Sequence, residues 1–326
     1  MKDSYGREIN YLRLSLTDRC NLRCVYCMPL HGLTFIPNKD LLTADELEKV
    51  VRAAVAVGFR KVRLTGGEPT LRQDIVNIVR RLASIDGVEQ LVMTTNGYRL
   101  PYIAQDLAEA GLKRVNIHID SLDRESVAKT MRLGSIDKAW AGIEAAEQAG
   151  LTPIKLNAVI TRGYNDNSAV NLAQLTLGKP WQIRFIELMP FGGPTEIQLQ
   201  HYVSSEEVKG WIEDKLGPLF PVSNGHLDGE ARVYRLAGAE GTLGFISPVS
   251  NPYCDDCNRM RVTADGRLRM CLLSDQEINF RQTLRAGGSH QDLVDLFKRA
   301  VWNKPVGHQL KNGLHPEART MSQIGG

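Results

Sequence analysis

Short apolar runs rich in β-branched residues alternate with amphipathic segments through the first 190 residues of this 326-residue chain. Six of the runs have the length and composition of strands: Ile9–Ser15, Lys61–Thr65, Gln90–Thr95, Arg114–Ile119, Pro153–Ile160 and Gln182–Glu187. The segments between them carry apolar residues with a helical period: Thr43–Gly58, Gln73–Ile85, Pro101–Ala110, Ile136–Ala149 and Asn167–Leu177. Thr43 and Glu46 form a capping box at the start of the first helix, and Gly58 is typical of a helix end.

Repeated strand–helix units predict parallel strands joined by right-handed crossovers. Six units are too few to close an eight-stranded barrel. The pattern therefore predicts an α/β fold in which residues 1–190 form a partial, open, six-stranded β/α barrel. A doubly wound sheet is the alternative.

The pattern changes after residue 190, where Phe191–Pro194 is typical of a Gly/Pro linker. A helix and several short strands follow, at Ser205–Leu216, Arg232–Leu236, Gly244–Ser247, Met260–Thr263 and Arg267–Met270. The last two strands flank Asp265-Gly266, which favours a β-hairpin. Residues 191–326 are predicted to form a C-terminal α+β extension that ends in two helical stretches and a Gly-Gly tail.

Polar motifs follow the predicted strands at their carboxyl ends. A cysteine-rich loop follows the first strand, T-G-G-E-P the second and T-T-N-G the third, while His118 and Asp120 end the fourth. Barrel enzymes place their chemistry at this end of the strands. Each motif alone is a weak signal, but their shared placement predicts that they meet at one site.

The six cysteines of the chain fall into two triplets. The first is C-x3-C-x2-C, formed by Cys20, Cys24 and Cys27, and the second is C-x2-C-x13-C, formed by Cys254, Cys257 and Cys271. A cubane iron–sulfur cluster normally takes four thiolates. A triplet therefore leaves one iron open to a small molecule, and this pattern indicates catalysis more than scaffolding.

The cysteines have two plainer interpretations, disulfides and a zinc site. Disulfides suit an oxidising compartment, but the N-terminus shows no export signal and no apolar run is long enough to span a bilayer. The sequence therefore predicts a cytoplasmic protein with reduced thiols. Zinc is the stronger alternative for the second triplet, with His226 or His290 as a fourth ligand.

The composition of the chain excludes few kinds of binding partner. The formal net charge is +3 and 43% of residues are hydrophobic, which is typical of a globular protein. A mildly basic chain does not require nucleic acid, and it suits a small polyanionic substrate if its arginines converge in a cavity.

The motifs carry a family resemblance over residues 5–326. C-x3-C-x2-C with Tyr26 before the last cysteine, followed by G-G-E-P, resembles the radical S-adenosylmethionine superfamily. R-L-T-G-G-E-P, T-T-N-G, I-R-F-I-E-L-M, C-D-D-C-N-R-x-R and the terminal I-G-G narrow the resemblance to the GTP 3′,8-cyclase family of molybdenum cofactor biosynthesis.

The resemblance implies a lyase that forms (8S)-3′,8-cyclo-7,8-dihydroguanosine 5′-triphosphate from GTP, using S-adenosylmethionine and two [4Fe–4S] clusters. The first triplet would hold one cluster, and the second triplet would hold another that faces guanine. Adenosylmethionine or substrate contacts are implied for Tyr26, Gly67, Thr94 or Thr95, His118 and Met189. GTP contacts are implied for Arg13, Arg63, Thr94, Lys155, Arg259, Met260 and Arg261. His118 departs from the family, which usually has serine there, and Gly325–Gly326 would enter the active site.

The expected partners are GTP, a one-electron donor and the next enzyme of pterin formation, with a homodimer as one possible assembly and neither nucleic acid nor a membrane. Two other functions stay open. One is a peptide-modifying radical enzyme with an auxiliary cluster, and the other is a zinc-stabilised RNA- or protein-binding module that is not an enzyme.

Overall fold

The structure is a computed structural model that describes residues 1–191, 199–222 and 227–325. Residues 192–194 of the predicted linker, His226 and Gly326 lie outside this part of the chain. None of the described helices combines the length and the apolar character that crossing a bilayer requires.

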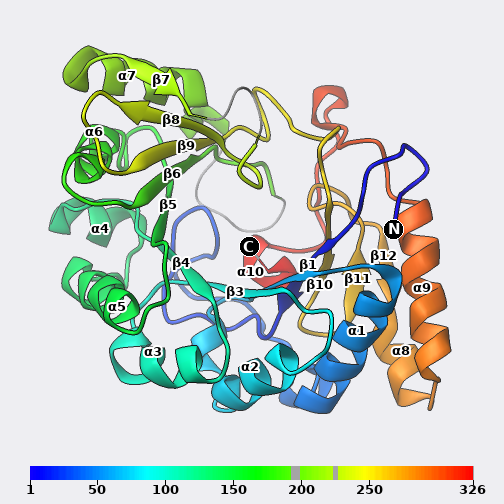
Figure 1. Ribbon diagram of the computed structural model, residues 1–326. Helices are drawn as coiled ribbons and strands as arrows, with labels where there is room; N and C mark the ends of the chain where they lie inside the picture. Colours follow the sequence, from blue (N-terminus) through cyan, green and yellow to red (C-terminus); the bar gives the residue numbers. More distant parts are fainter. Residues whose placement is uncertain (192–198, 223–226, 326) are drawn as a thin grey trace.

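The six predicted strands form the centre of a curved sheet and lie side by side in chain order (Figure 1). They are β1 (Tyr11–Ser15), β2 (Lys61–Thr65), β3 (Gln90–Thr95), β4 (Arg114–His118), β5 (Lys155–Val159) and β6 (Gln182–Ile186). Each pairs in parallel with the next. The predicted parallel, open β/α barrel is confirmed.

Strands from the second part of the chain extend this sheet at both edges. They are β7 (Leu219–Pro221), β8 (Arg232–Leu236), β9 (Thr242–Ile246), β10 (Arg259–Val262), β11 (Arg267–Arg269) and β12 (Glu277–Asn279). β9 pairs in parallel with β6, β10 pairs in parallel with β1, and the outer strands are antiparallel. The described residues thus share one twelve-stranded sheet, in which strands from both sides of the predicted boundary at residue 190 pair with each other.

Helices cover the outer face of the curved sheet (Figure 1). The α-helices are α1 (Ala44–Val57), α2 (Ile75–Ala83), α3 (Leu100–Glu109), α4 (Arg124–Thr130), α5 (Ile136–Gln148), α6 (Ser168–Gln174), α7 (Ser205–Leu216), α8 (Phe280–Arg285), α9 (His290–Trp302) and α10 (Met321–Ile324). Short 3₁₀ turns lie at Asn38–Asp40, Pro69–Leu71, Leu175–Leu177, Leu199–His201 and Leu310–Asn312. The predicted capping box of Thr43 and Glu46 begins α1, and Gly58 ends it with a φ of 108°.

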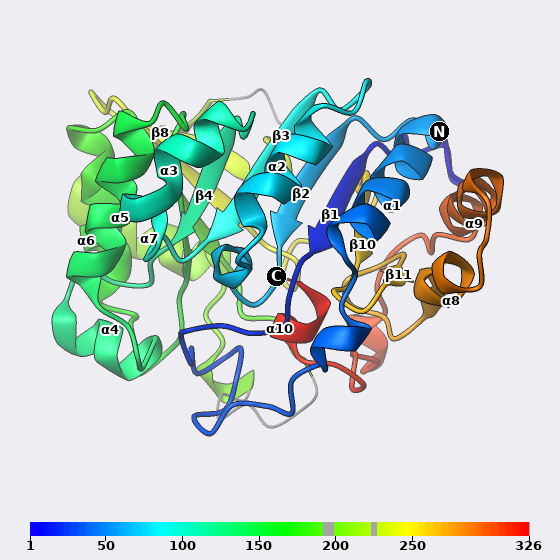
Figure 2. The same cartoon turned by 90° about the horizontal axis from the view of Figure 1, so that it is seen from below.

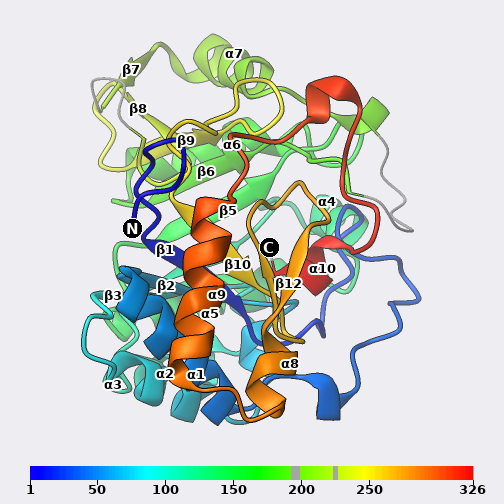
Figure 3. The same ribbon diagram turned by 90° about the vertical axis from the view of Figure 1, so that its right-hand side faces the viewer.

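The core lies between the sheet and its outer helices. On the side seen in Figure 3, α9 packs beside α1. The ring of Phe297 on α9 lies 5.4 Å from that of Phe59, which follows α1, and 4.8 Å from that of Phe280 on α8. Burying side chains of this size stabilises a fold by about 1.5–3 kcal/mol each, so the C-terminal helices join the same core as the barrel.

The inner face of the sheet receives the end of the chain. Figure 1 shows α10 inside the arc of strands, and Figure 2 shows the carboxyl ends of β1 and β2 pointing toward it. The loop that follows β1 and carries the first cysteine triplet lies at the same end (Figure 2). The fold therefore brings the first motif and the last helix to one place.

Candidate functional site

A cavity opens at the carboxyl ends of the central strands. The motifs predicted to converge do line it: Cys20, Cys24, Tyr26, Cys27, Gly67, Thr94, Thr95, His118 and Met189. These residues come from the ends of β1, β2, β3, β4 and β6, as expected for parallel strands that share one direction.

The two glycines after β2 let the cysteine loop approach the sheet. A Cβ atom at Gly66 would lie 2.5 Å from the carbonyl oxygen of Thr17, and one at Gly67 would lie 2.3 Å from that of Arg19. The same approach forms two backbone hydrogen bonds of 2.7 Å, from Gly67 N to Thr17 O and from Glu68 N to Arg19 O. Only glycine allows this distance, so the G-G-E sequence fixes the loop to β2.

Glu68 connects the ends of β2 and β3. Its buried carboxylate accepts hydrogen bonds from the hydroxyls of Thr70 (2.6 Å) and Thr95 (2.7 Å) and from the backbone N–H of Asn96 (2.7 Å). Asn96 in turn donates from Nδ2 to Asn21 in the cysteine loop at 2.7 Å. Burial raises the pKa of Glu68, while these hydrogen bonds oppose the shift. The T-G-G-E-P and T-T-N-G motifs therefore hold the cysteine loop in position.

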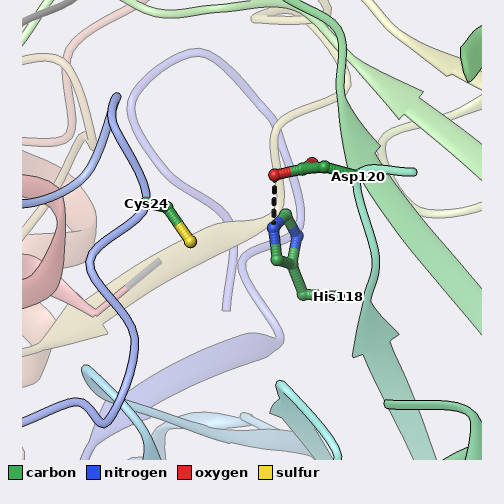
Figure 4. A group of neighbouring side chains, drawn as sticks. All are labelled: Cys24, His118 and Asp120. Atoms are coloured by element: carbon green, nitrogen blue, oxygen red, sulfur yellow. Dashed lines mark hydrogen bonds and ion pairs between the residues drawn. The ribbon is translucent and has the colours of Figure 1, made fainter. Parts of the chain in front are cut away.

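His118 belongs to a compact polar group next to the first triplet (Figure 4). The Tyr26 hydroxyl lies 2.6 Å from Nε2 of His118 and donates to Asp120 at 2.7 Å, and Nε2 of His118 lies 3.0 Å from the same carboxylate oxygen. Burial opposes a charge on the imidazole, but Asp120 outweighs it and raises the pKa of His118 well above its usual value. Cys24 points toward this imidazole, and ligand atoms of Cys24, His118 and Asp120 lie within 4.8 Å of one another.

The second triplet lines a second, smaller cavity. The hairpin of β10 and β11 forms as predicted and carries Cys271 back beside Cys254 and Cys257. Lys304 is buried in the same cavity and donates from Nζ to the carbonyl oxygen of Met270 at 2.6 Å. Burial raises the pKa of Cys257, but the charges of Lys304 and Arg259 outweigh it and lower that pKa overall. The positive charges therefore favour the thiolate of Cys257, whereas burial raises the pKa of Cys271 in the same cavity.

The structure describes all six cysteines and one of the two histidines considered as zinc ligands, while His226 lies outside the described residues. All six cysteines are free thiols. His290, proposed as a zinc ligand, is the exposed first residue of α9 and does not line the second cavity. His308 does line it, but its ring nitrogens face Pro248 O at 2.9 Å and Leu310 N at 3.4 Å.

The two cavities adjoin. Residues that line both are Met189, Tyr253, Arg261 and Leu272. A molecule that spans this shared wall would reach both cysteine triplets.

Cations from several strands gather at the first cavity. Arg13, Arg63 and Arg261 line it and lie opposite one another on β1, β2 and β10. Arg63 donates to the hydroxyl of Thr94 at 3.1 Å. Arg184 on β6 also lines the cavity; it lies in the I-R-F-I-E-L-M motif but was not among the residues expected to bind GTP. The site therefore has the charge for a polyanion.

Three other residues predicted to bind GTP do not line the first cavity. Lys155 forms an ion pair with Asp228 and does not border the first cavity. Arg259 and Met260 border the second cavity. Because side chains alternate along a strand, Met260 points away from the two arginines of β10, and its side chain packs in the hydrophobic core.

The described end of the chain lies inside the site. Met321 and Ser322 line the first cavity. Gly325 has a φ of 91°, and a Cβ atom there would lie 2.7 Å from Oγ1 of Thr65 and 2.8 Å from Cβ of Ser15. The position accepts only a residue without a side chain.

Two family models together match most of the chain. Residues 14–176 match the model described as "Radical SAM superfamily", and residues 181–310 match the one described as "Molybdenum Cofactor Synthesis C".

Curated proteins are similar over the full length. Proteins named "GTP 3′,8-cyclase" are 47% identical in Pelotomaculum thermopropionicum and 48% identical in Moorella thermoacetica, each over 326 residues and 100% of both chains. One from Heliobacterium modesticaldum is 46% identical over 330 residues, again with 100% of both chains covered.

Solved structures are similar in fold. Streptococcus suis SuiB bound to S-adenosylmethionine superposes with a TM-score of 0.63 at 15% identity, covering 92% of this chain and 67% of that one. Methylornithine synthase (PylB) gives a TM-score of 0.50 at 17% identity over 64% of this chain and 62% of that one. At such identities the likeness supports the partial barrel alone.

Proposed function

Because this chain belongs to the GTP 3′,8-cyclase family of radical S-adenosylmethionine enzymes, we propose that it converts GTP to (8S)-3′,8-cyclo-7,8-dihydroguanosine 5′-triphosphate in molybdenum cofactor biosynthesis. The observation that carries the proposal is the pair of adjoining cavities, each lined by one cysteine triplet and together bordered by arginines.

Membership in the superfamily implies one [4Fe–4S] cluster and S-adenosylmethionine. Cys20, Cys24 and Cys27 fit the cluster, because all three are free and line one cavity. Three thiolates would leave one iron of the cluster open, and with bound adenosylmethionine the cluster would supply the radical chemistry that removes a ribose hydrogen. We assign Tyr26, Gly67, His118 and Met189 to the wall around adenosylmethionine. Tyr26 and His118 would orient it by hydrogen bonds, and Asp120 would fix both side chains.

The proposal includes a second [4Fe–4S] cluster at Cys254, Cys257 and Cys271. These thiols are also free and share one cavity, where positive charge favours the thiolate of Cys257. The backbone approaches closely at Gly307, where a Cβ atom would lie 3.0 Å from Sγ of Cys254. The guanine of GTP would face this cavity.

The residues of the protein would bind and align the nucleotide. Guanidinium groups donate paired hydrogen bonds to phosphate oxygens. We assign the triphosphate to Arg13, Arg63, Thr94, Lys155, Arg184, Arg259 and Arg261. Met260 would contact GTP only through its backbone, because its side chain packs in the hydrophobic core. Holding reactants in a near-attack geometry can be worth about 7–11 kcal/mol, so alignment across the shared wall is the main contribution expected of the protein.

The partners follow from the reaction. Chemistry of this superfamily needs a one-electron donor, and an enzyme of pterin formation would take the product. Six free thiols suit a reducing compartment such as the cytoplasm. A homodimer stays a prediction.

The test is anaerobic reconstitution followed by iron and sulfide counting. Two cubanes predict about eight irons per chain, and either Cys24→Ala or Cys257→Ala should retain about half of them. Cys24→Ala should abolish adenosylmethionine cleavage, whereas Cys257→Ala should retain some cleavage and lose cyclisation. Zinc in place of iron would support the binding-module alternative.

Equilibrium binding of GTP and ATP to the same reconstituted protein tests the substrate. We expect GTP to bind far more tightly, because guanine would offer O6 and N1 to a cluster in the second cavity and adenine lacks that oxygen. Equal affinity, together with cleavage stimulated by peptides, would favour the peptide-modifying alternative.

A further inference from the structure

A glutamate lies among the cations assigned to the triphosphate. The carboxylate of Glu230 lies 2.6 Å from Nη1 of Arg259 and 3.6 Å from guanidinium nitrogens of both Arg13 and Arg184. Its side chain is only 12% exposed and it lines the first cavity. Burial would raise the pKa of Glu230, but the guanidinium groups of Arg259, Arg184 and Arg13 hold it well below its usual range. Glu230 is therefore an anion inside the proposed nucleotide site.

Asp228 and Gly229, which directly precede Glu230, also offer oxygen atoms to the surrounding cations. Asp228 forms an ion pair with Lys155, and its carbonyl oxygen accepts a 2.9 Å hydrogen bond from Nη2 of Arg184. The carbonyl of Gly229 lies 3.5 Å from Nη2 of Arg259. A segment of three residues thus offers carboxylate and carbonyl oxygens to cations on β1, β5, β6 and β10. A polyphosphate chain would offer the same kind of acceptor to the same cations.

We propose that the segment Asp228–Glu230 is an internal anion that occupies the polyphosphate end of the nucleotide site, and that a nucleotide must displace it to bind. This inference rests on the proposed function and extends it, because Glu230 then determines how many phosphates a ligand needs. Arginine cannot release its proton, so an empty cluster of this kind requires a counter-charge. The carboxylates supply it when no nucleotide is bound.

Because the segment must leave before a nucleotide can bind, the apparent affinity equals the intrinsic affinity multiplied by the fraction of molecules in which the segment is displaced. A monophosphate has few oxygens with which to replace two carboxylates and two carbonyls. A triphosphate has enough oxygens and charge to replace all four. The segment therefore selects for GTP over GMP without any contact to the base.

The test compares wild type, Glu230→Gln and Glu240→Gln as full chains reconstituted anaerobically. Glu240 is an exposed carboxylate between β8 and β9, so its replacement removes the same charge outside the site. Titration calorimetry with inorganic tripolyphosphate, GMP and GTP measures affinity. We expect Glu230→Gln to bind tripolyphosphate and GMP at least about tenfold more tightly, equivalent to about 1.4 kcal/mol, and Glu240→Gln to match wild type.

Unchanged or weaker tripolyphosphate binding in Glu230→Gln overturns the inference. Asp228→Asn serves as a second variant if circular dichroism shows that Glu230→Gln does not fold, and it should also tighten binding, though by a smaller factor. The two proposals fail separately. GTP that binds wild type and Glu230→Gln with equal affinity overturns the internal anion alone. Tripolyphosphate binding as expected, with no GTP binding to any variant, overturns the proposed function alone.

Discussion

The guanidinium Nη1 of Arg261 donates a 2.8 Å hydrogen bond to the carbonyl oxygen of Gly325, 64 residues further along the chain. Arg261 belongs to β10 and lines both cavities, while Gly325 directly follows α10. Burial and the neighbouring charge of Arg13 lower the pKa of Arg261 below its usual value, despite opposing charges, but a guanidinium still keeps its proton at neutral pH. The end of the chain is therefore tied to the wall that the two cavities share.

Gly325→Ala should release this end from the site. Alanine at a left-handed φ costs about 1–2 kcal/mol, and its Cβ would also collide with Thr65 and Ser15. We expect faster hydrogen exchange over Met321–Ile324, because this helix loses its attachment to Arg261. Gly313→Ala is the control, because Gly313 has a φ of 75° but open space around its Cβ position. Equal effects of the two variants would show that strain alone matters.

Arg319 should anchor the segment before α10. Its guanidinium makes a paired contact with Asp265 (3.2 and 2.9 Å) and lies 2.7 Å from Glu277. Arg319→Ala should reduce the free energy of unfolding by about 1.5–3 kcal/mol, the range for hydrogen bonds to charged groups. The control, Arg124→Ala, removes the exposed pair with Asp137 and should cost less than about 1 kcal/mol. Urea unfolding measures both, and similar losses would contradict the anchor.

Lys155 should make nucleotide binding depend on pH. Burial and the charge of Arg184 lower the pKa of Lys155 to about 8, although Asp228 opposes the shift. The lysine loses its charge as pH rises through this value, so GTP affinity should fall there. Lys155→Arg keeps its charge, and comparing the two proteins at each pH cancels any titration of the ligand. A constant affinity ratio between about pH 7 and pH 9 would contradict the assignment.

The same shift has an opposite sign for stability. An unfolded lysine has a pKa of about 10.4, so between about pH 8 and that value the unfolded chain binds more protons than the folded one. The contribution of Lys155 to the free energy of unfolding therefore increases with pH across this window.

Removal of iron should leave the fold intact. The main core is built from apolar side chains between sheet and helices and includes no cysteine. Chelation or exposure to air should yield an apo chain with oxidisable thiols and nearly unchanged far-ultraviolet circular dichroism. A collapse of that signal would show that the clusters hold the barrel together.

Local signals predicted the central fold. The observed bounds of β2 and β3 coincide with the predicted ones, and α1 lies between its predicted cap and stop. Periodicity and capping act within a few residues, so the sequence shows them directly. The pairing of β10 with β1 joins Tyr11 to Arg259. Such pairing depends on how the whole chain packs, and no local pattern reports it.

The candidate site likewise contains residues that local sequence identifies and others that only the folded chain brings into place. Cysteine spacing and glycine motifs identified the two triplets and the loops around the first cavity. Glu230 and Lys304 were missed, because a single charged residue gives no signal until the fold orients it. Arg184 was not selected although it belongs to the I-R-F-I-E-L-M motif. Met260 was selected by its place between two arginines, whereas strand geometry turns its side chain to the opposite face.

The addition of late strands to both edges of the sheet has a consequence for synthesis. When residues 1–190 have left the ribosome, β1 and β6 are the outer strands of a parallel sheet, and each still lacks its neighbour. Unpaired edges are templates for aggregation, and elongation at about 5–20 residues per second leaves them open for several seconds. We therefore expect a nascent chain stalled before β9 to depend on chaperones. In the complete protein, β9 and β10 pair with β6 and β1 and so protect these two edges from aggregation.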